Sequence, residues 1–410
     1  MPNHHIKPIL KTAGIVLALC AYVAGAWFFS RSTPYYNITN MSGADRISYE
    51  KARVLSIDYQ DVGPDKTYRQ MQTGTQTATI RILTGEYKGQ AEKIKNGLNY
   101  DSNYLLSPGE DIIVSVNTAA SGKTINIFLY SPDRGPWLYI LIGLFVLSLC
   151  AIGGRKGFRS VIAILFTLTS VVFVFIPLLY RGASPAAAAL AFAGMTAVVT
   201  LLLIGGWKVK TAAAILGTVI GVAFSAGVLR LFEYLASLSG YNMSEYDTLL
   251  VISGHSGMRV DQLLFASVII SSLGAVMDIA ISVASSVNEV SSSDPLAGAG
   301  RLFRSGIRVG RDMMGTMANT LILAFVGGSL NMLILIYAYR MNYFQIINSN
   351  TIAIEIMQAF SGSLAVVFTV PLVSLTAAKL LTISSCRRNG VPALPELPSP
   401  PGAKEPVAAK

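Results

Sequence analysis

Eight stretches of about 19 mostly apolar residues divide the chain, and each is long enough to cross the roughly 30 Å hydrocarbon core of a bilayer. These stretches predict transmembrane helices near residues 13–29, 137–152, 160–179, 187–204, 212–229, 263–286, 315–338 and 359–381. Between the first two, continuous apolar runs give way to short alternating ones, which are typical of β-strands. The pattern therefore predicts an α-helical integral membrane protein with one inserted β domain.

The inserted domain, residues 31–135, is expected to be a small antiparallel β unit. Its strand-like runs lie at Ala52–Asp58, Thr77–Leu83, Asp111–Asn117 and Thr124–Tyr130, and Gly89–Gly97 is either another strand or a loop. Turn residues such as Gly63-Pro64-Asp65 and Pro108-Gly109 separate these runs. We expect an extracytoplasmic barrel or sandwich, similar to an OB-fold, between the first and second transmembrane helices.

The stretch Leu263–Glu289 has two different helical faces. Polar and small residues recur at steps of three and four, which places them on one face of a helix. They are Ser267, Ser271, Gly274, Ala275, Asp278, Ser282, Ser285 and Glu289. The other side carries Ile269, Leu273, Val276 and Val283, which suit lipid or apolar helix packing.

Asp278 lies near the centre of this row of polar and small residues. A charged Asp at the centre of a membrane helix costs about 2.5–3.5 kcal/mol on insertion scales, so it is expected to face a cavity or a polar partner. It is either a proton, cation or substrate site, or a structural carboxylate bonded to neighbouring helices. On the first interpretation, a substrate or ion pathway is lined by Ser271, Asp278, Ser282, Asn319 and Asn331.

Two further patterns concern helix packing and the membrane surface. Ala213, Gly217, Gly221 and Ser225 recur four residues apart and predict close contact with another helix. After Asp294-Pro295, basic residues recur on one side of a segment that resembles a helix lying on the inner leaflet. These residues are Arg301, Arg304, Arg308 and Arg311, and they suit either a simple anchor or a lipid-sensing gate.

Composition and charge define the class and the orientation. Of 410 residues, 52% are hydrophobic and only 13% charged, which is typical of a multipass membrane protein. With the N-terminus inside, the cytoplasmic segments carry Lys7, Lys11, Arg155, Lys156, Arg159, Lys208, Lys210, Arg301, Arg304, Arg308, Arg311, Lys379, Arg387 and Arg388. The short outer loops carry Arg181, Arg230, Arg259 and Arg340. This asymmetry follows the positive-inside rule and predicts that both termini are cytoplasmic.

The net charge of +10 therefore indicates contact with anionic lipid at the inner leaflet and no nucleic-acid partner. Nucleophile-elbow, P-loop and HExxH motifs are absent from the sequence. His255 has no clustered Cys or carboxylate, so we predict no metal, no cofactor and no catalytic residue. Cys20, Cys150 and Cys386 lie in two spans and the inner tail and do not form a disulfide in the outer domain.

The segments SSLGAVMDIAISVASSVNE and GRDMMGTMANTLILAFVGGSL resemble the YibE/F family of multipass bacterial membrane proteins. The resemblance covers roughly residues 135–383, together with the anchor and the outer β domain. It implies an integral protein of a bacterial inner membrane and implies no particular activity.

We expect four parts: an N-terminal stub with its anchor (1–30), the outer β domain (31–135), a seven-helix membrane domain (136–385) and a disordered Pro-rich cytoplasmic tail (386–410). The first helix is interpreted as an uncleaved anchor, although Ala24-Gly25-Ala26 also suits a signal-peptidase site.

Two functions fit these patterns. One is a permease or exporter with a pathway around Asp278. The other is a membrane-anchored receptor or envelope assembly factor, which binds a protein partner through residues 31–135. Homo-oligomers fit either function, and an intramembrane enzyme has the least support because only Asp278 lies deep in a span.

Overall fold

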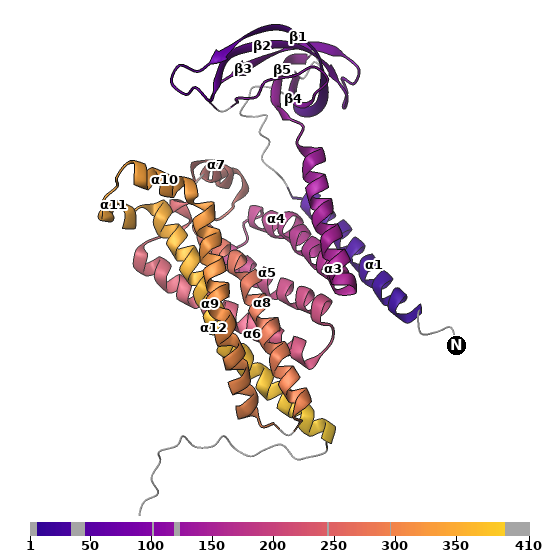
Figure 1. Cartoon of the computed structure of the whole chain (residues 1–410), viewed down its shortest axis with the longest axis vertical. Helices are drawn as coiled ribbons and strands as arrows, with labels where there is room; N and C mark the ends of the chain where they lie inside the picture. Colours follow the sequence, from indigo (N-terminus) through magenta and orange to yellow (C-terminus); the bar gives the residue numbers. More distant parts are fainter. Residues whose placement is uncertain are drawn as a thin grey trace, which may run out of the picture. The chain divides into compact units, whose positions relative to one another are not determined.

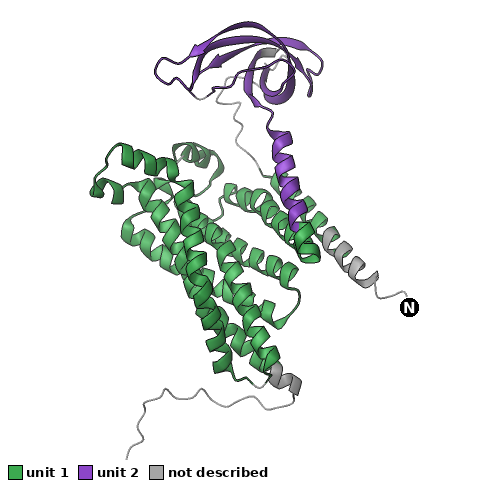
Figure 2. Ribbon diagram, viewed as in Figure 1, with its two compact units in different colours: residues 1–35, 150–410 green, residues 36–149 purple. Residues whose placement is uncertain are grey.

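A computed structural model describes residues 6–33, 46–100, 102–118, 124–243, 246–295 and 297–389. The chain forms two compact units (Figure 2). Unit 1 comprises Met1–Tyr35 and Cys150–Lys410 and is helical in its described parts. Unit 2, Tyr36–Leu149, contains a β-sheet and the beginning of a helix.

The sheet of unit 2 is a five-stranded antiparallel half-barrel (Figure 1). Its strands are β1 (Arg46–Pro64), β2 (Gln72–Ile82), β3 (Ala91–Leu98), β4 (Asp111–Thr118) and β5 (Thr124–Pro132). They are ordered β3-β2-β1-β4-β5. The prediction of a separate antiparallel β unit is confirmed, and the ambiguous segment Gly89–Gly97 contains most of β3.

The alternation that predicted the strands also forms the core of the sheet. In β4, Ile112, Val114 and Val116 are fully buried, and the residues between them are less buried. Two register shifts in β1 interrupt its pairing with β2, and such bulges bend a strand and increase its twist. Alternation and bulges together account for a curved sheet with one buried face.

The first helices of unit 1 differ from the prediction in their boundaries. Helix α1 is Ile6–Arg31, and α3 (Gly135–Ser170) continues through the π-helical η1 (Val171–Phe175) into α4 (Ile176–Tyr180). A straight helix from Gly135 to Tyr180 would be about 69 Å long, roughly twice the bilayer core. Gly154 interrupts it with φ 52° and ψ −131°, a backbone conformation that glycine readily adopts. Two predicted windows, 137–152 and 160–179, lie on either side of this break.

The remaining helices form the main bundle (Figure 1). The long helices are α5 (Pro185–Gly205), α6 (Val209–Ala236), α8 (Leu263–Ser293), α9 (Ala299–Gly328) and α12 (Asn350–Asn389). Shorter elements are η2 (Gly240–Asn242), α7 (Tyr246–Ser256), α10 (Leu330–Ala338) and α11 (Tyr343–Ile347). Helix α8 contacts α5, α6, α9 and α12, and its buried side chains form much of the apolar core.

The small residues of α6 allow it to approach α12 closely, as the sequence predicted. Gly217 and Gly221 are buried, and a Cβ at either position would overlap Val373 or Thr369 of α12. Glycine is therefore required there by the close approach of the two helices.

Among the described residues, five helices are long and apolar enough to cross a membrane, or six if the bent pair α9–α10 is one span. The predicted number of eight is not confirmed. Two windows, 137–152 and 160–179, fall within one interrupted helix. Within the described part of α1, the apolar helix is Leu17–Arg31, which is shorter than a span.

The predicted boundaries near α9 and α12 also change. The seventh window, 315–338, crosses a 63° bend at Ser329, and the basic segment before it belongs to the same continuous helix, α9. Helix α12 runs through Asn389, so its end lies beyond residue 385. The remainder of the predicted tail, residues 390–410, lies outside the described residues.

Candidate functional site

Helix α8 turns its apolar face into the bundle and its polar face outward. Ile269, Leu273, Val276 and Val283 are at most 3% exposed. On the opposite face, Ser271, Gly274 and Asp278 are exposed and Ser282 is half-buried. Of the two alternatives for the apolar face, helix packing is therefore correct. Asp278 makes no hydrogen bond or ion pair to another described residue, so the structure shows it outside the bundle core.

The outward surface of α8 and α9 differs from that of the other spans. In α8, the exposed residues are Ser271, Gly274, Asp278, Glu289, Ser292 and Ser293. In α9, from Ala299 to Thr320, they are Gly300, Arg301, Arg304, Arg308, Arg311, Asp312, Gly315, Thr316, Asn319 and Thr320. Neither stretch exposes a large apolar side chain. We call this combined surface, residues 271–293 and 300–320, the polar face.

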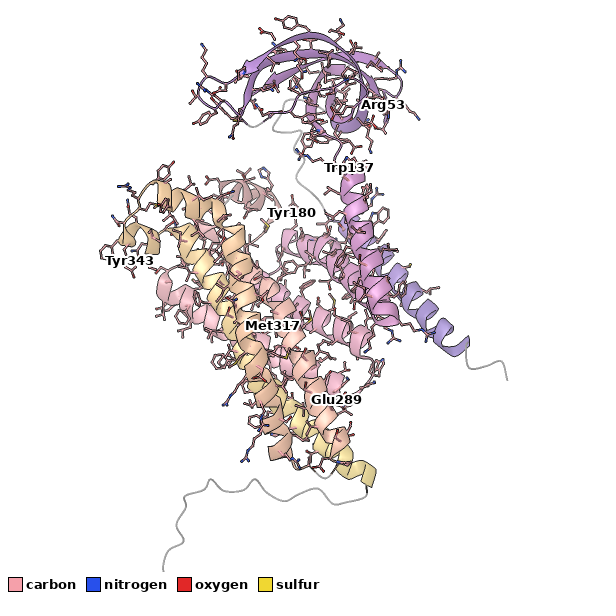
Figure 3. The ribbon with its side chains drawn as sticks, viewed as in Figure 1. Arg53, Trp137, Tyr180, Glu289, Met317 and Tyr343 are labelled. Carbon is pink, nitrogen blue, oxygen red and sulfur yellow. The ribbon has the colours of Figure 1, made fainter. Side chains whose placement is uncertain are left out.

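Two sets of contacts fix the relative heights of α8 and α9. Gly306 of α9 lies against Val287 of α8, and both Leu321 of α9 and Ser272 of α8 lie against Gly362 of α12. On each helix these two contacts are 15 residues apart, and the helices run antiparallel. Asp278 therefore lies level with Gly315. Figure 3 labels Glu289 near the end of α8 and Met317 near the middle of α9.

This register places the predicted pathway residues. Ser271, Asp278 and Ser282 share one stripe of α8, and Asn319 is exposed on α9 about one turn from the level of Asp278. Asn331 is also exposed but lies on α10, beyond the bend at Ser329, and so lies apart from the other four. The structure thus brings four of the five residues to one depth range on the polar face.

Charges are distributed unevenly along the polar face. Arg301 pairs with Asp294, and Lys210 of α6 donates to Ser285 of α8 at 3.3 Å. Arg304, Arg308 and Arg311 are exposed on α9, and they form no ion pair with another described residue. The acidic residues of α8 and the basic residues of α9 therefore face outward without neutralising one another.

Sequence reasoning missed several polar contacts that depend on the tertiary fold. Gln358 of α12 donates to Ser267 at 3.2 Å, and Glu233, only 5% exposed, pairs with Arg230 at 3.2 Å. At the α9–α10 bend, a cavity of about 130 Å³ has an almost entirely apolar surface, and its lining residues include Glu355 and Ser329, whose hydroxyl is buried. The adjacent Gly327-Gly328 pair was a sequence signal for this break.

The outer unit also has a candidate binding surface. The exposed rings of Tyr49 and Tyr130 meet edge-on with centroids 4.8 Å apart. A groove of about 530 Å³ lies between the end strands β3 and β5, and its walls include Lys93, Lys95 and Phe128.

Acidic groups of this unit are held in their charged form. Hydrogen bonds from the backbone N–H groups of Tyr68 and Thr67 lower the pKa of Asp65. Donation from the Thr79 hydroxyl, helped by Lys93, lowers the pKa of Asp58. Arg53, hydrogen-bonded at 2.7 Å, lowers the pKa of Asp111.

Within the described part of the chain, no group of three or more His, Cys, Asp or Glu residues could hold a metal ion. Nδ1 of His255 lies 2.9 Å from the carbonyl oxygen of Val251 one turn earlier in α7, and the side chain is exposed.

A family model described as YibE/F-like protein matches residues 141–383, more than half of the chain. The chain belongs to the YibE/F-like family. The matched region of this YibE/F-like chain contains all of α8, α9 and the polar face, and the five strands lie outside it. No curated protein and no solved structure matches the chain. The family and the apolar helices together indicate a membrane protein.

Proposed function

We propose that this YibE/F-like protein is a permease or exporter whose substrate pathway follows the polar face around Asp278. The observation that carries the proposal is the outward stripe of α8, where a carboxylate, hydroxyls and glycine replace large apolar side chains at membrane depth. A bilayer does not solvate such groups, and charged residues inside membranes mark substrate and ion pathways.

Asp278 has a specific role in this proposal. Its carboxylate binds a proton or cation in one state and releases it in another, and this exchange is coupled to movement of a polar solute. Ser271, Ser282 and Asn319 supply hydrogen-bonding groups within about two turns of it. The apolar core on the other side of α8 keeps the pathway at the outer surface of the bundle.

In this proposal the protein lies in a bacterial inner membrane with both termini in the cytoplasm. Loop charges support this orientation, since Lys210 and the arginines of α9 lie toward the same end of α8. These arginines then contact anionic headgroups of the inner leaflet, while the half-barrel, which we regard as OB-like, faces outward.

A substrate is first identified by comparing the solutes that accumulate in a deletion strain and in its parent strain. Asp278→Asn keeps the side-chain shape but removes its titration, so it should abolish substrate movement while membrane levels stay near normal. Asp247→Asn, at an exposed Asp of α7 outside the polar face, is the matched control and should retain movement. Full activity of a well-expressed Asp278→Asn protein would contradict the proposal.

A second candidate function is a receptor or envelope assembly factor that acts through the outer unit. The exposed Tyr49–Tyr130 pair and the groove between β3 and β5 favour it. Replacing both tyrosines with alanine should then abolish complementation of the deletion strain, and Asp278→Asn should preserve it. The opposite result favours the permease, and neither candidate includes a catalytic step.

A further inference from the structure

We propose that the polar face is an interface between two copies of this chain, with α8 of each copy lying against α9 of the other. The pathway would then be enclosed by two subunits, a consequence that rests on the proposed function. The interface itself rests on the exposed residues, their charges and their heights in the bundle.

The polar face lacks the large apolar side chains that are typical of a lipid-facing surface. The lipid-facing surface of α6 exposes Leu216, Val219, Ile220 and Phe224, as expected of a surface solvated by hydrocarbon chains. The polar face offers Ser271, Gly274 and Gly315 instead. Small residues on membrane helices allow backbones to approach closely, and polar side chains between helices hydrogen-bond across them. This composition suits a second protein surface better than lipid.

The exposed charges of α8 and α9 are opposite in sign. The outward stripe of α8 contains two acidic residues, Asp278 and Glu289, and no basic residue. The outward surface of α9 contains Arg304, Arg308 and Arg311, with Asp312 as its acidic residue. An α8 surface is therefore complementary to an α9 surface, whereas two α8 surfaces would repel one another.

The acidic residues of α8 and the arginines of α9 lie at matching depths in the bundle. A two-fold axis along the membrane normal keeps every residue at its own depth in both copies, and it makes each contact occur twice. Glu289 lies two residues from Val287, and Arg304 lies two residues from Gly306, so these two charges are level. Asp278 is level with Gly315, and Arg311 is one turn away, about 6 Å along the axis.

The symmetric pairing therefore matches opposite charges at two heights. Arg304 of the partner subunit faces Glu289, and Arg311 of the partner subunit reaches Asp278 with its long side chain. Gly274 is level with Asn319 of the partner subunit, so its missing side chain leaves space for the amide. The candidate site thus consists of Asp278 from one copy and Arg311 and Asn319 from the other, and a single copy leaves it open.

Cysteine cross-linking in native membranes tests this arrangement. In a full-length chain with Cys20, Cys150 and Cys386 replaced by serine, a tagged Gly274→Cys copy is co-expressed with a differently tagged Asn319→Cys copy. Oxidation should link the two tags. A matched control is Gly227→Cys in both copies, since Gly227 is exposed on the same side of α6 as Ile220 and has no atom within 4 Å of the position of a Cβ. Its height follows from two contacts with α12: Gly221 lies against Thr369, and Ser272 of α8 lies against Gly362. Since α6 and α12 are antiparallel, Gly227 is level with Ser363 and therefore close to the depth of Gly274.

Charge exchange supplies a second measurement. Arg311→Asp should weaken dimerisation about tenfold, equivalent to about 1.4 kcal/mol, and Arg311→Asp combined with Asp278→Arg should restore it. Cross-linking at Gly227→Cys equal to that at the 274–319 pair would overturn the proposal. So would absence of a 274–319 link while both thiols react with maleimide. A specific link together with full transport by Asp278→Asn would keep the interface and reject the proposed function.

Discussion

Helices α6 and α8 contact one another and α12, but their outward surfaces are opposite in chemistry. Helix α6 buries a stripe of small residues and exposes large apolar side chains such as Ile220 and Phe224. Helix α8 buries Ile269, Leu273 and Val276 and exposes Ser271, Gly274 and Asp278. Since both helices have the length and apolar composition of spans, the position of a residue on its helix decides what its chemistry does.

Small residues on α6 and on α8 have different roles. On α6, Gly217 and Gly221 allow close packing within the chain, because Val373 and Thr369 occupy the space that a side chain would take. On α8, no atom lies within 4 Å of the position that a Cβ would take at Gly274, so its small size serves no contact inside the chain. In the proposed interface, a small residue at this position leaves space for a side chain of the second copy.

The largest expected effect comes from filling the buried stripe. Gly217→Leu forces α6 away from α12, because even a Cβ at this position would overlap both the side chain and the backbone of Val373. The cost should exceed the roughly 1–3 kcal/mol that is typical of adding methylene groups to a packed core. We expect a strong loss of folded protein, measured as the monodisperse fraction in mild detergent and as Tm. Gly274→Leu is the matched control and should leave the single chain folded while it reduces cross-linking between copies. Equal loss of folded protein in both variants would remove the distinction between the two stripes.

A charge placed on each helix sharpens the same comparison. Ile220→Asp puts a carboxylate on the lipid-facing surface of α6, which costs about 2.5–3.5 kcal/mol on insertion scales. Membrane levels should fall clearly below those of the parent protein. An added carboxylate near Asp278, Gly274→Asp, should be better tolerated because the exposed surface of α8 already carries polar groups. If Gly274→Asp lowers membrane levels as much as Ile220→Asp, α8 faces lipid as α6 does.

Sequence reasoning predicted the fold well wherever a pattern repeats along one element. The alternating runs identified four strands, and the steps of three and four identified both faces of α8. The number of spans was harder to predict, because two windows belong to one helix that is interrupted at Gly154, and another window is bent at Ser329. Apolar windows report composition, whereas such breaks depend on backbone conformation at single residues.

The candidate site was predictable as a set of residues but not in its environment. Helical periodicity placed Ser271, Asp278 and Ser282 on one face, and the structure agrees. Periodicity does not decide which face packs inward, since this depends on α5, α6, α9 and α12 surrounding the apolar side. Asn319 and Asn331 lie in one apolar window of the sequence, and the bend between them separates the two in the structure.

The smallest expected effect concerns the outer unit. Asp58, Asp65 and Asp111 have pKa values below their usual range, so their contribution to stability is complete above the unfolded pKa of Asp, about 3.9. It is lost as the pH falls through the lower folded pKa values, because protonation removes the hydrogen-bonded carboxylates. Hydrogen exchange of β2 in the intact protein should therefore accelerate between pH 5 and pH 2 after correction for the intrinsic rate.

Asp65→Asn is the control for this pH effect, since it removes the titrating group that accepts from Thr67 and Tyr68. The variant should show a smaller change with pH than the parent protein. An unchanged pH profile would show that this carboxylate does not stabilise the unit. Because none of these groups is buried, the effect should be smaller than that of either membrane substitution.

The central claim is that the outward face of α8 does not face lipid. Spin labels at Gly274→Cys and Gly227→Cys, two exposed positions at similar depth, test it most directly in a protein free of other cysteines and reconstituted in bilayers. Position 274 should be less accessible than position 227 to oxygen, which concentrates in lipid. Equal, lipid-like accessibility at both positions would contradict it.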